Sequence, residues 1–105
     1  MDNFNEIRSA VSQRKIEWRR HALERLMERG FTRSDVFSAV ESGEIIESDV
    51  DRKPFPTYLW FATINARTIH VVIAWDRNTR TAHIVTVYEP DEEHFENNLK
   101  TRRQR

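Results

Sequence analysis

The amino-terminal part of the chain carries apolar residues at the three- and four-residue spacing that is typical of amphipathic helices. This spacing predicts helices over residues 2–13, 19–28 and 33–42. Thr32 and Asp35 form the pattern of a capping box at the start of the third helix, with Asp in place of the usual Glu. Gly30 and Gly43 follow the second and third helices, at positions where glycine commonly ends a helix.

From Glu44 onward the pattern changes to that of β-strands. Segments rich in β-branched and aromatic residues are separated by polar turns. They predict strands over residues 44–48, 57–64, 68–75 and 81–88. The short turns between the last three strands predict an antiparallel meander. Because Pro54 and Pro56 cannot donate to a strand ladder, residues 49–56 are expected to form a loop or an edge.

The end of the chain carries a further helical pattern. Pro90 ends the last strand, and the acidic residues 91–93 suit the first turn of a closing helix anchored by Phe95 and Leu99. Together these elements predict an α+β fold with a single domain over residues 1–105. In this fold the amino-terminal helices pack on one face of a four-stranded antiparallel sheet, and a carboxy-terminal helix closes the chain.

Alternation along the last two predicted strands assigns their side chains to two faces of the sheet. In the third strand, Ile69, Val71, Ile73 and Trp75 alternate with His70, Val72 and Ala74. In the fourth strand, Ile84, Thr86 and Tyr88 alternate with His83, Val85 and Val87. One face is strongly apolar and is expected to cover the helices, but the other face is also partly apolar. We expect the closing helix, a second copy of the chain or a partner protein to cover that second face.

Composition limits the class of protein. Cysteine is absent, which excludes disulfides and thiolate chemistry and suits the reducing environment of the cytoplasm. The longest apolar runs, 58–62 and 71–75, are far shorter than the ~20 residues that span a bilayer, so no membrane association is expected. Seventeen basic and seventeen acidic residues give zero formal net charge. Basic residues gather in the first third and at 100–105, whereas 41–51 and 89–96 are acidic, and this distribution permits an anionic partner on one face.

The second predicted helix has the clearest potential for chemistry. His21, Arg25 and Arg29 fall along one stripe of this helix. The stripe lies opposite the apolar residues Leu23, Leu26 and Met27. Two interpretations stay open: the arginines bind a phosphate while the histidine moves a proton, or the stripe is a solvated surface paired with neighbouring glutamates.

Two further histidines, His70 and His83, lie within predicted strands, where both a core role and a functional role stay open. The histidines do not have the spacing of metal ligands, and the sequence has no glycine-rich phosphate loop. We therefore expect neither a metal nor a cofactor.

Four sequence blocks occur in order between residues 18 and 91. They are His21-Ala22-x-x-Arg25-x-x-x-Arg29-Gly30, Gly43-Glu44-Ile45-Ile46-Glu47, Arg67-x-x-His70-Val71-Val72-x-Ala74 and Thr86-x-Tyr88-Glu89-Pro90-Asp91. With these blocks the chain resembles a bacterial family of domains of unknown function that is similar to RelE-type toxins, within the barnase-like group of ribonucleases.

The resemblance implies that RNA lies across the second face of the sheet and is cleaved without metal, with the 2′-hydroxyl of the RNA as nucleophile. In such a reaction His21 or His70 would serve as base or acid, together with Arg25 and Tyr88 as catalytic groups. Arg29 and Arg67 would bind the substrate. The expected partners are RNA or ribosome-bound mRNA and a cognate antitoxin protein.

A second function stays open. RelE-type toxins are strongly basic, whereas this chain has zero formal net charge, which does not favour tight unaided RNA binding. The alternative is a non-catalytic protein-binding module on the same fold, with a homodimer as one form of it.

Overall fold

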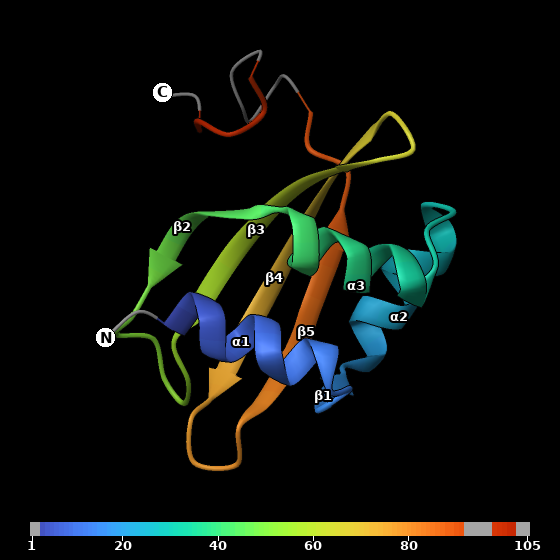
Figure 1. Ribbon diagram of the computed structural model, residues 1–105. Coiled ribbons are helices and arrows are strands. Elements are labelled where there is room, and N and C mark those ends of the chain that lie inside the picture. Colours follow the sequence, from blue (N-terminus) through green and yellow to red (C-terminus); the bar gives the residue numbers. More distant parts are fainter. Residues whose placement is uncertain (1–2, 92–97, 103–105) are drawn as a thin grey trace.

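The computed structural model describes residues 3–91 and 98–102. Three helices and five strands follow one another along this part of the chain: α1 (Asn3–Ser12), β1 (Ile16–Trp18), α2 (Arg20–Glu28), α3 (Arg33–Ser42), β2 (Glu44–Asp49), β3 (Thr57–Ile64), β4 (Arg67–Asp76) and β5 (Thr81–Tyr88). The strands form one sheet in the order β1-β5-β4-β3-β2. Figure 1 shows α1 and α3 crossing one face of this sheet, with α2 beside β5.

The predicted helix boundaries are set by local chemistry. The Thr32 side chain accepts a hydrogen bond from the backbone N–H of Asp35 at 3.1 Å, and the Asp35 carboxylate accepts one from the N–H of Thr32 at 2.8 Å, which confirms the capping box. Gly30 has φ +73°, the left-handed conformation in which glycine is favoured. Gly43 ends α3 for a different reason, since a Cβ atom there would lie 2.3 Å from the carbonyl oxygen of Phe61.

The predicted four-stranded antiparallel sheet is wrong, because the sheet has five strands and is mixed. The sequence interpretation missed β1, which pairs in parallel with β5, Ile16 opposite Ala82 and Trp18 opposite Ile84. Its three residues are too few to display an alternation of apolar and polar positions. Arg14 adopts φ 62° just after α1, and this left-handed residue turns the chain into the short strand.

The predicted closing helix is also wrong for the residues that the structure describes. Residues 98–101 form a turn and bends, Arg102 forms a single β-bridge, and Leu99 has the left-handed φ of 58°. The Asn98 side chain accepts hydrogen bonds from the backbone N–H groups of Lys100 at 2.9 Å and Thr101 at 3.1 Å. Such a side-chain turn competes with helix formation. Phe95 and the acidic residues 92–93 lie outside the described residues.

A β-bulge changes the predicted alternation in β5. Val72 pairs with Thr86 and Ile73 pairs with Ile84, so that Val85 has no opposite residue on β4. Beyond this bulge the faces exchange: Val87 is buried on the helix side, and Tyr88 lies on the other face opposite His70. The prediction that Ile84, Thr86 and Tyr88 share a face is therefore wrong.

The core lies between the sheet and the helices. Its largest fully buried side chains include Trp60, Trp75, Ile69, Val71 and Ile73. The ring of Phe4 in α1 stacks on Trp60 at 5.4 Å between centroids. No helix in the described part of the chain combines the length and the apolar character needed to cross a membrane.

The second face of the sheet, which we call the outer face, presents Leu59 and Phe61 of β3, His70, Val72 and Ala74 of β4, and His83, Thr86 and Tyr88 of β5. Leu59, His70 and Ala74 are buried although α1 and α3 lie on the opposite face. Two segments of the chain itself contribute to this burial. Residues 98–102 contact one end of the outer face, and the β2–β3 loop, residues 50–56, contacts the other.

Candidate active-site groove

Helix α2 is fixed along β5 by one backbone contact and by two buried side chains. The N–H of Arg19 donates to the carbonyl of Ile84 at 3.2 Å, just before the helix begins. Ala22 and Leu26 are buried, whereas Met27, predicted on the apolar side, is 79% exposed. The buried stripe is thus rotated toward Ala22, because a residue four positions before Leu26 shares its face of the helix.

The stripe formed by His21, Arg25 and Arg29 faces a cavity of about 360 Å³ between α2 and the end of β5. We call this cavity the α2–β5 groove. Its lining consists of His21, Arg25, Arg29, Thr86, Tyr88, Glu89, Pro90, Asp91 and Arg102. Of the six site residues predicted from sequence, the groove therefore brings together His21, Arg25, Arg29 and Tyr88, but not His70 or Arg67.

The α2 side of the groove contains a histidine next to an arginine. The Nε atom of Arg25 donates to Nε2 of His21 at 3.4 Å, so in this arrangement Nε2 acts as an acceptor. Arg25 also lies 3.7 Å from Glu28, an exposed pair that water screens. The guanidinium of Arg29 makes no hydrogen bond with the residues that the structure describes. Both arginines are therefore available to an anion.

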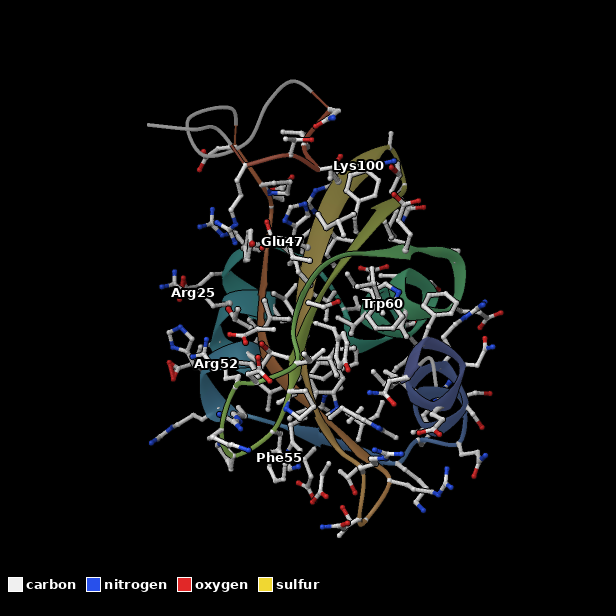
Figure 2. The ribbon with its side chains drawn as sticks, turned by 90° about the vertical axis from the view of Figure 1, so that its left-hand side faces the viewer. Arg25, Glu47, Arg52, Phe55, Trp60 and Lys100 are labelled. Carbon is white, nitrogen blue, oxygen red and sulfur yellow. The ribbon has the colours of Figure 1, made fainter. Side chains whose placement is uncertain are left out.

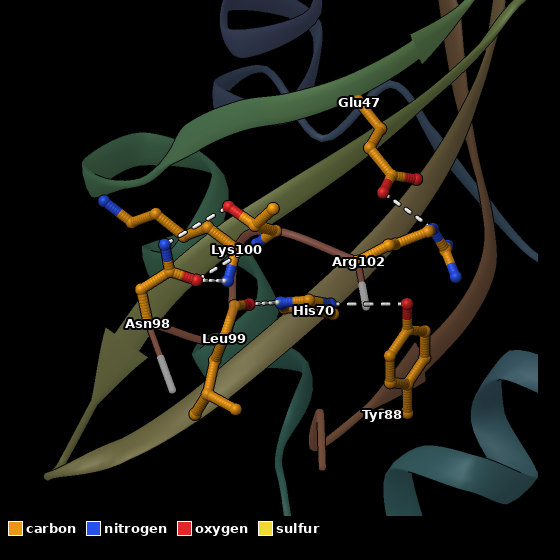
Figure 3. Close-up of polar contacts among 8 residues, drawn as sticks. Glu47, His70, Tyr88, Asn98, Leu99, Lys100 and Arg102 are labelled. Carbon is orange, nitrogen blue, oxygen red and sulfur yellow. Dashed lines mark hydrogen bonds and ion pairs between the residues drawn. The ribbon is translucent and has the colours of Figure 1, made fainter. Parts of the chain in front are cut away.

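His70 supports the groove from behind instead of lining it. The imidazole is fully buried, with Nε2 2.8 Å from the carbonyl oxygen of Leu99 and Nδ1 3.3 Å from the hydroxyl of Tyr88 (Figure 3). A carbonyl oxygen only accepts, so Nε2 carries the proton, and Nδ1 of the neutral ring accepts from Tyr88. Burial lowers the pKa of His70, which agrees with a neutral ring.

Tyr88 connects this buried histidine to the groove. Burial raises the pKa of its phenol, while the nearby Arg102 guanidinium acts in the opposite direction. The hydroxyl is therefore protonated near neutral pH. Its single proton is donated to Nδ1 of His70 in this arrangement, so it reaches a bound oxygen in the groove only when the hydroxyl rotates away from the imidazole.

Residues 98–102 bring a further cation to the groove, and we call this segment the C-terminal strap. Arg102 lies 2.7 Å from Glu47 (Figure 3) and Lys100 lies 3.0 Å from Glu44, so two ion pairs attach the strap to β2. The ammonium of Lys100 also lies 4.8 Å from the ring centroid of Phe61. Sequence reasoning did not assign Arg102 to the site, although the basic end of the chain and the acidic character of residues 41–51 were the signal for this contact.

Arg67 has a structural position. Its guanidinium donates to Glu89 at 2.8 and 3.3 Å and to the carbonyl of Arg29 at 2.6 Å, and it lies 4.0 Å from the ring centroid of Phe31. The hydrogen bond between Arg67 and Glu89 raises the pKa of Arg67 and lowers that of Glu89. Arg67 therefore ties the end of α2 to the end of β5 and fixes the width of the groove at that point.

Across residues 3–91 and 98–102, no three side chains of His, Cys, Asp or Glu come close enough together to hold a metal ion. The polar groups that line the groove are an imidazole, guanidinium groups, a phenol, a hydroxyl and two carboxylates.

The family described as Domain of unknown function (DUF4258) matches residues 18–89, which is more than half of the chain. The chain therefore belongs to this family. The matched residues run from the end of β1 to the first residue after β5, so they include both α2 and β5, between which the groove lies. No curated protein and no solved structure gives a significant match.

Proposed function

We propose that the α2–β5 groove binds single-stranded RNA and cleaves it without a metal ion, with the neighbouring 2′-hydroxyl as nucleophile. One observation carries this proposal: His21, Arg25 and Arg29 on α2 line the same groove as Tyr88 on β5. An RNA phosphodiester holds its nucleophile next to the phosphorus atom, so the protein need only move protons and stabilise charge.

The proton transfers follow from the positions of the groups. Nε2 of His21 takes the proton of the 2′-hydroxyl, whose oxygen then bonds to phosphorus. The bond from phosphorus to the 5′-oxygen breaks, and the hydroxyl of Tyr88 rotates away from Nδ1 of His70 and donates its proton to that leaving oxygen. The products are a 2′,3′-cyclic phosphate and a 5′-hydroxyl, and the proton held by His21 returns to Tyr88 to restore the starting state.

The cations of the groove suit the phosphate in this reaction. Arg25 and Arg29 present planar guanidinium groups that match two oxygens of a phosphate. Arg102 adds a third cation from the C-terminal strap. Of the two carboxylates in the lining, Glu89 is already paired with Arg67, which reduces its repulsion of a bound anion.

The four sequence blocks resemble a family that is itself similar to RelE-type toxins, and this resemblance favours the same class of activity. A toxin of that class would meet its RNA in the cytoplasm and would be held inactive by a cognate antitoxin. Both partners remain part of the proposal.

The test uses purified protein and a fluorescent RNA dodecamer in excess chelator, beside the same strand in which every 2′-hydroxyl is replaced by hydrogen. We expect cleavage of the RNA and none of the deoxy strand. The His21→Ala variant should lose the activity and regain part of it when free imidazole is added. Cleavage of the deoxy strand, or cleavage that the chelator abolishes, would contradict the mechanism.

The alternative is a non-catalytic protein-binding module. The zero net charge and the ion pair that engages Arg102 favour it. A protein that cleaves no RNA, with or without ribosomes, but forms a stable complex with a second protein would be such a module.

A further inference from the structure

A second cavity, of about 170 Å³, lies on the outer face beyond the α2–β5 groove. Its floor is apolar and consists of Val72, Ala74 and Val85, the last being the bulged residue of β5. Its walls come from the residue before α2 and from the β2–β3 loop: Arg19, Arg52, Lys53, Pro54, Phe55 and Thr57. We call it the loop cavity.

The loop cavity is strongly cationic. Arg19, Arg52 and Lys53 line it, and its lining contains no acidic residue. In contrast to Arg67 and Arg102, these three side chains have no ion pair or hydrogen bond with the part of the chain that the structure describes. Cations that gather around an apolar floor without a partner form a surface complementary to an anion with an apolar body.

An aromatic surface borders the same cavity. The ring of Phe55 stacks on the imidazole of His83, with 5.3 Å between centroids and 9° between planes. Phe55 is held in place because the N–H of Trp75 donates to the carbonyl of Pro56 at 3.0 Å. A flat ring next to guanidinium groups is the combination on which proteins stack an unpaired base beside its phosphate.

The loop cavity and the α2–β5 groove each share lining residues with a third cavity that lies between them. This third cavity, of about 260 Å³, shares Arg102 with the groove and shares Arg52, Thr57 and Val72 with the loop cavity. In Figure 2, Arg25, Arg52 and Phe55 follow one another along one side of the molecule. The connecting cavity carries Asp49 and the paired Glu47, so the cationic character is concentrated at the two ends of the path.

We propose that the loop cavity is a second subsite, which holds a nucleotide of the same single-stranded RNA whose scissile phosphate lies in the α2–β5 groove. This inference rests on the proposed function. The two subsites lie along β5: His83, on which Phe55 stacks, precedes Tyr88 by five positions, a length of roughly 16 Å at the rise of a β-strand. A dinucleotide would therefore occupy the groove alone, whereas a longer strand would also reach Phe55, Arg52 and Lys53.

Binding of a strand that cannot be cleaved tests the subsite. The probe is a fluorescein-labelled octamer of 2′-O-methyl uridine, measured by fluorescence anisotropy over a range of salt concentrations. The double variant Arg52→Gln/Lys53→Gln should bind on the order of tenfold more weakly, with a salt slope lower by about 1.4, since each phosphate contact on a single strand contributes about 0.7. Phe55→Leu should weaken binding about fivefold or more. Arg33→Gln, which removes a cation from α3 behind the sheet, should bind as the wild-type protein does, and thermal melting should confirm that every variant is folded.

The results of these experiments distinguish failure of the second subsite from failure of the proposed catalysis. Wild-type protein that binds the octamer through Arg52, Lys53 and Phe55 but cleaves no RNA would refute the proposed catalysis and support the subsite. Protein that cleaves a dinucleotide but binds the octamer equally well in all variants would refute the subsite alone. Equal weakening by Arg33→Gln would also overturn it, because binding would then depend on overall charge.

Discussion

Tyr88 and His70 face each other across β5 and β4, with 3.3 Å between the phenol oxygen and Nδ1 of the imidazole. The bulge at Val85 creates this contact, because without it Tyr88 would point into the core on the helix side. His70 in turn holds the carbonyl of Leu99. One buried imidazole therefore positions both the phenol at the groove and the strap that supplies Arg102.

Substitution of His70 by leucine should destabilise the fold. Leucine is of similar size but removes the acceptor of the Tyr88 proton and the donor to the carbonyl of Leu99, at a cost of about 1–3 kcal/mol. Urea unfolding measures the change. His83→Leu is the matched control, because this imidazole is half-buried and stacks on Phe55, and it should change stability by less than ~0.5 kcal/mol. Equal effects of the two substitutions would contradict the role of His70.

Stability should fall on mild acidification because of the same histidine. Burial lowers the pKa of His70 in the folded protein below its unfolded value of about 6.5. Below about pH 6.5 the unfolded chain binds more protons than the folded one. The contribution of His70 to the free energy of unfolding is therefore complete above the unfolded pKa and is lost as the pH falls toward the lower pKa of the folded protein. The limiting slope is about 1.4 kcal/mol per pH unit. Urea unfolding over roughly pH 5 to 8 should show this loss in the wild-type protein and a flatter profile in His70→Leu. Parallel pH profiles for the wild-type protein and His70→Leu would contradict this role of His70.

Arg25 and Arg20 lie on different sides of α2, so substitution of each in turn tests whether Arg25 has a specific role in catalysis. Arg25→Gln should lower kcat for RNA cleavage about 10²-fold, because it removes a donor from the charged oxygens of the transition state. Arg20→Gln removes the same charge from the same helix at a side chain that is 94% exposed and lies outside the groove, so kcat should not change. A loss of similar size in both variants would mean that helix stability or overall charge is responsible.

Arg67 is expected to act on structure rather than on the phosphate. Arg67→Lys keeps the charge but cannot bond Glu89 and the carbonyl of Arg29 at the same time. It should therefore increase hydrogen exchange at the amides of Gly30 and Phe31, which close the end of α2. The rate of RNA cleavage should fall much less than in Arg25→Gln. Unchanged exchange together with a large loss of kcat would instead place Arg67 on the substrate.

Substitution by alanine should destabilise the protein more at Gly43 than at Gly30, although only Gly30 has a left-handed φ. Gly30→Ala places a side chain at φ +73°, where its Cβ makes only an ordinary contact of 3.8 Å with the Arg67 side chain, at a cost of about 1 kcal/mol. Gly43→Ala would place Cβ 2.3 Å from the carbonyl oxygen of Phe61 and 2.4 Å from that of Ala39, two backbone atoms that cannot move aside. We expect a loss of about 3 kcal/mol there, measured by urea unfolding. A smaller loss at Gly43 than at Gly30 would contradict the close packing of α3 on β3.

The sequence predicted those parts of the structure that local chemistry determines. The capping box at Thr32, the left-handed Gly30 and the register of apolar residues in β4 depend on residues a few positions apart, and the structure confirms them. The stripe of His21, Arg25 and Arg29 also followed from helical spacing. That it would lie beside Tyr88 could not be predicted from spacing alone, since it depends on how α2 packs on β5.

The features that the sequence did not predict depend on contacts between distant residues or on a shift of one residue. β1 is a strand only because β5 offers a parallel edge to three residues. The bulge at Val85 reverses the faces of Thr86, Val87 and Tyr88, and nothing in the local pattern marks it. The strap follows the outer face because Arg102 and Lys100 meet carboxylates on β2, more than fifty residues earlier in the chain.

The most direct test of the central claim, that the groove cleaves RNA through the 2′-hydroxyl of the substrate, is mass spectrometry of the products. A uridine-rich RNA dodecamer is incubated with wild-type protein in excess chelator, and the new ends are identified. We predict fragments that end in a 2′,3′-cyclic phosphate and begin with a 5′-hydroxyl, and none of them with the His21→Ala variant. New 5′-phosphate ends, or the same fragments from His21→Ala, would contradict the account.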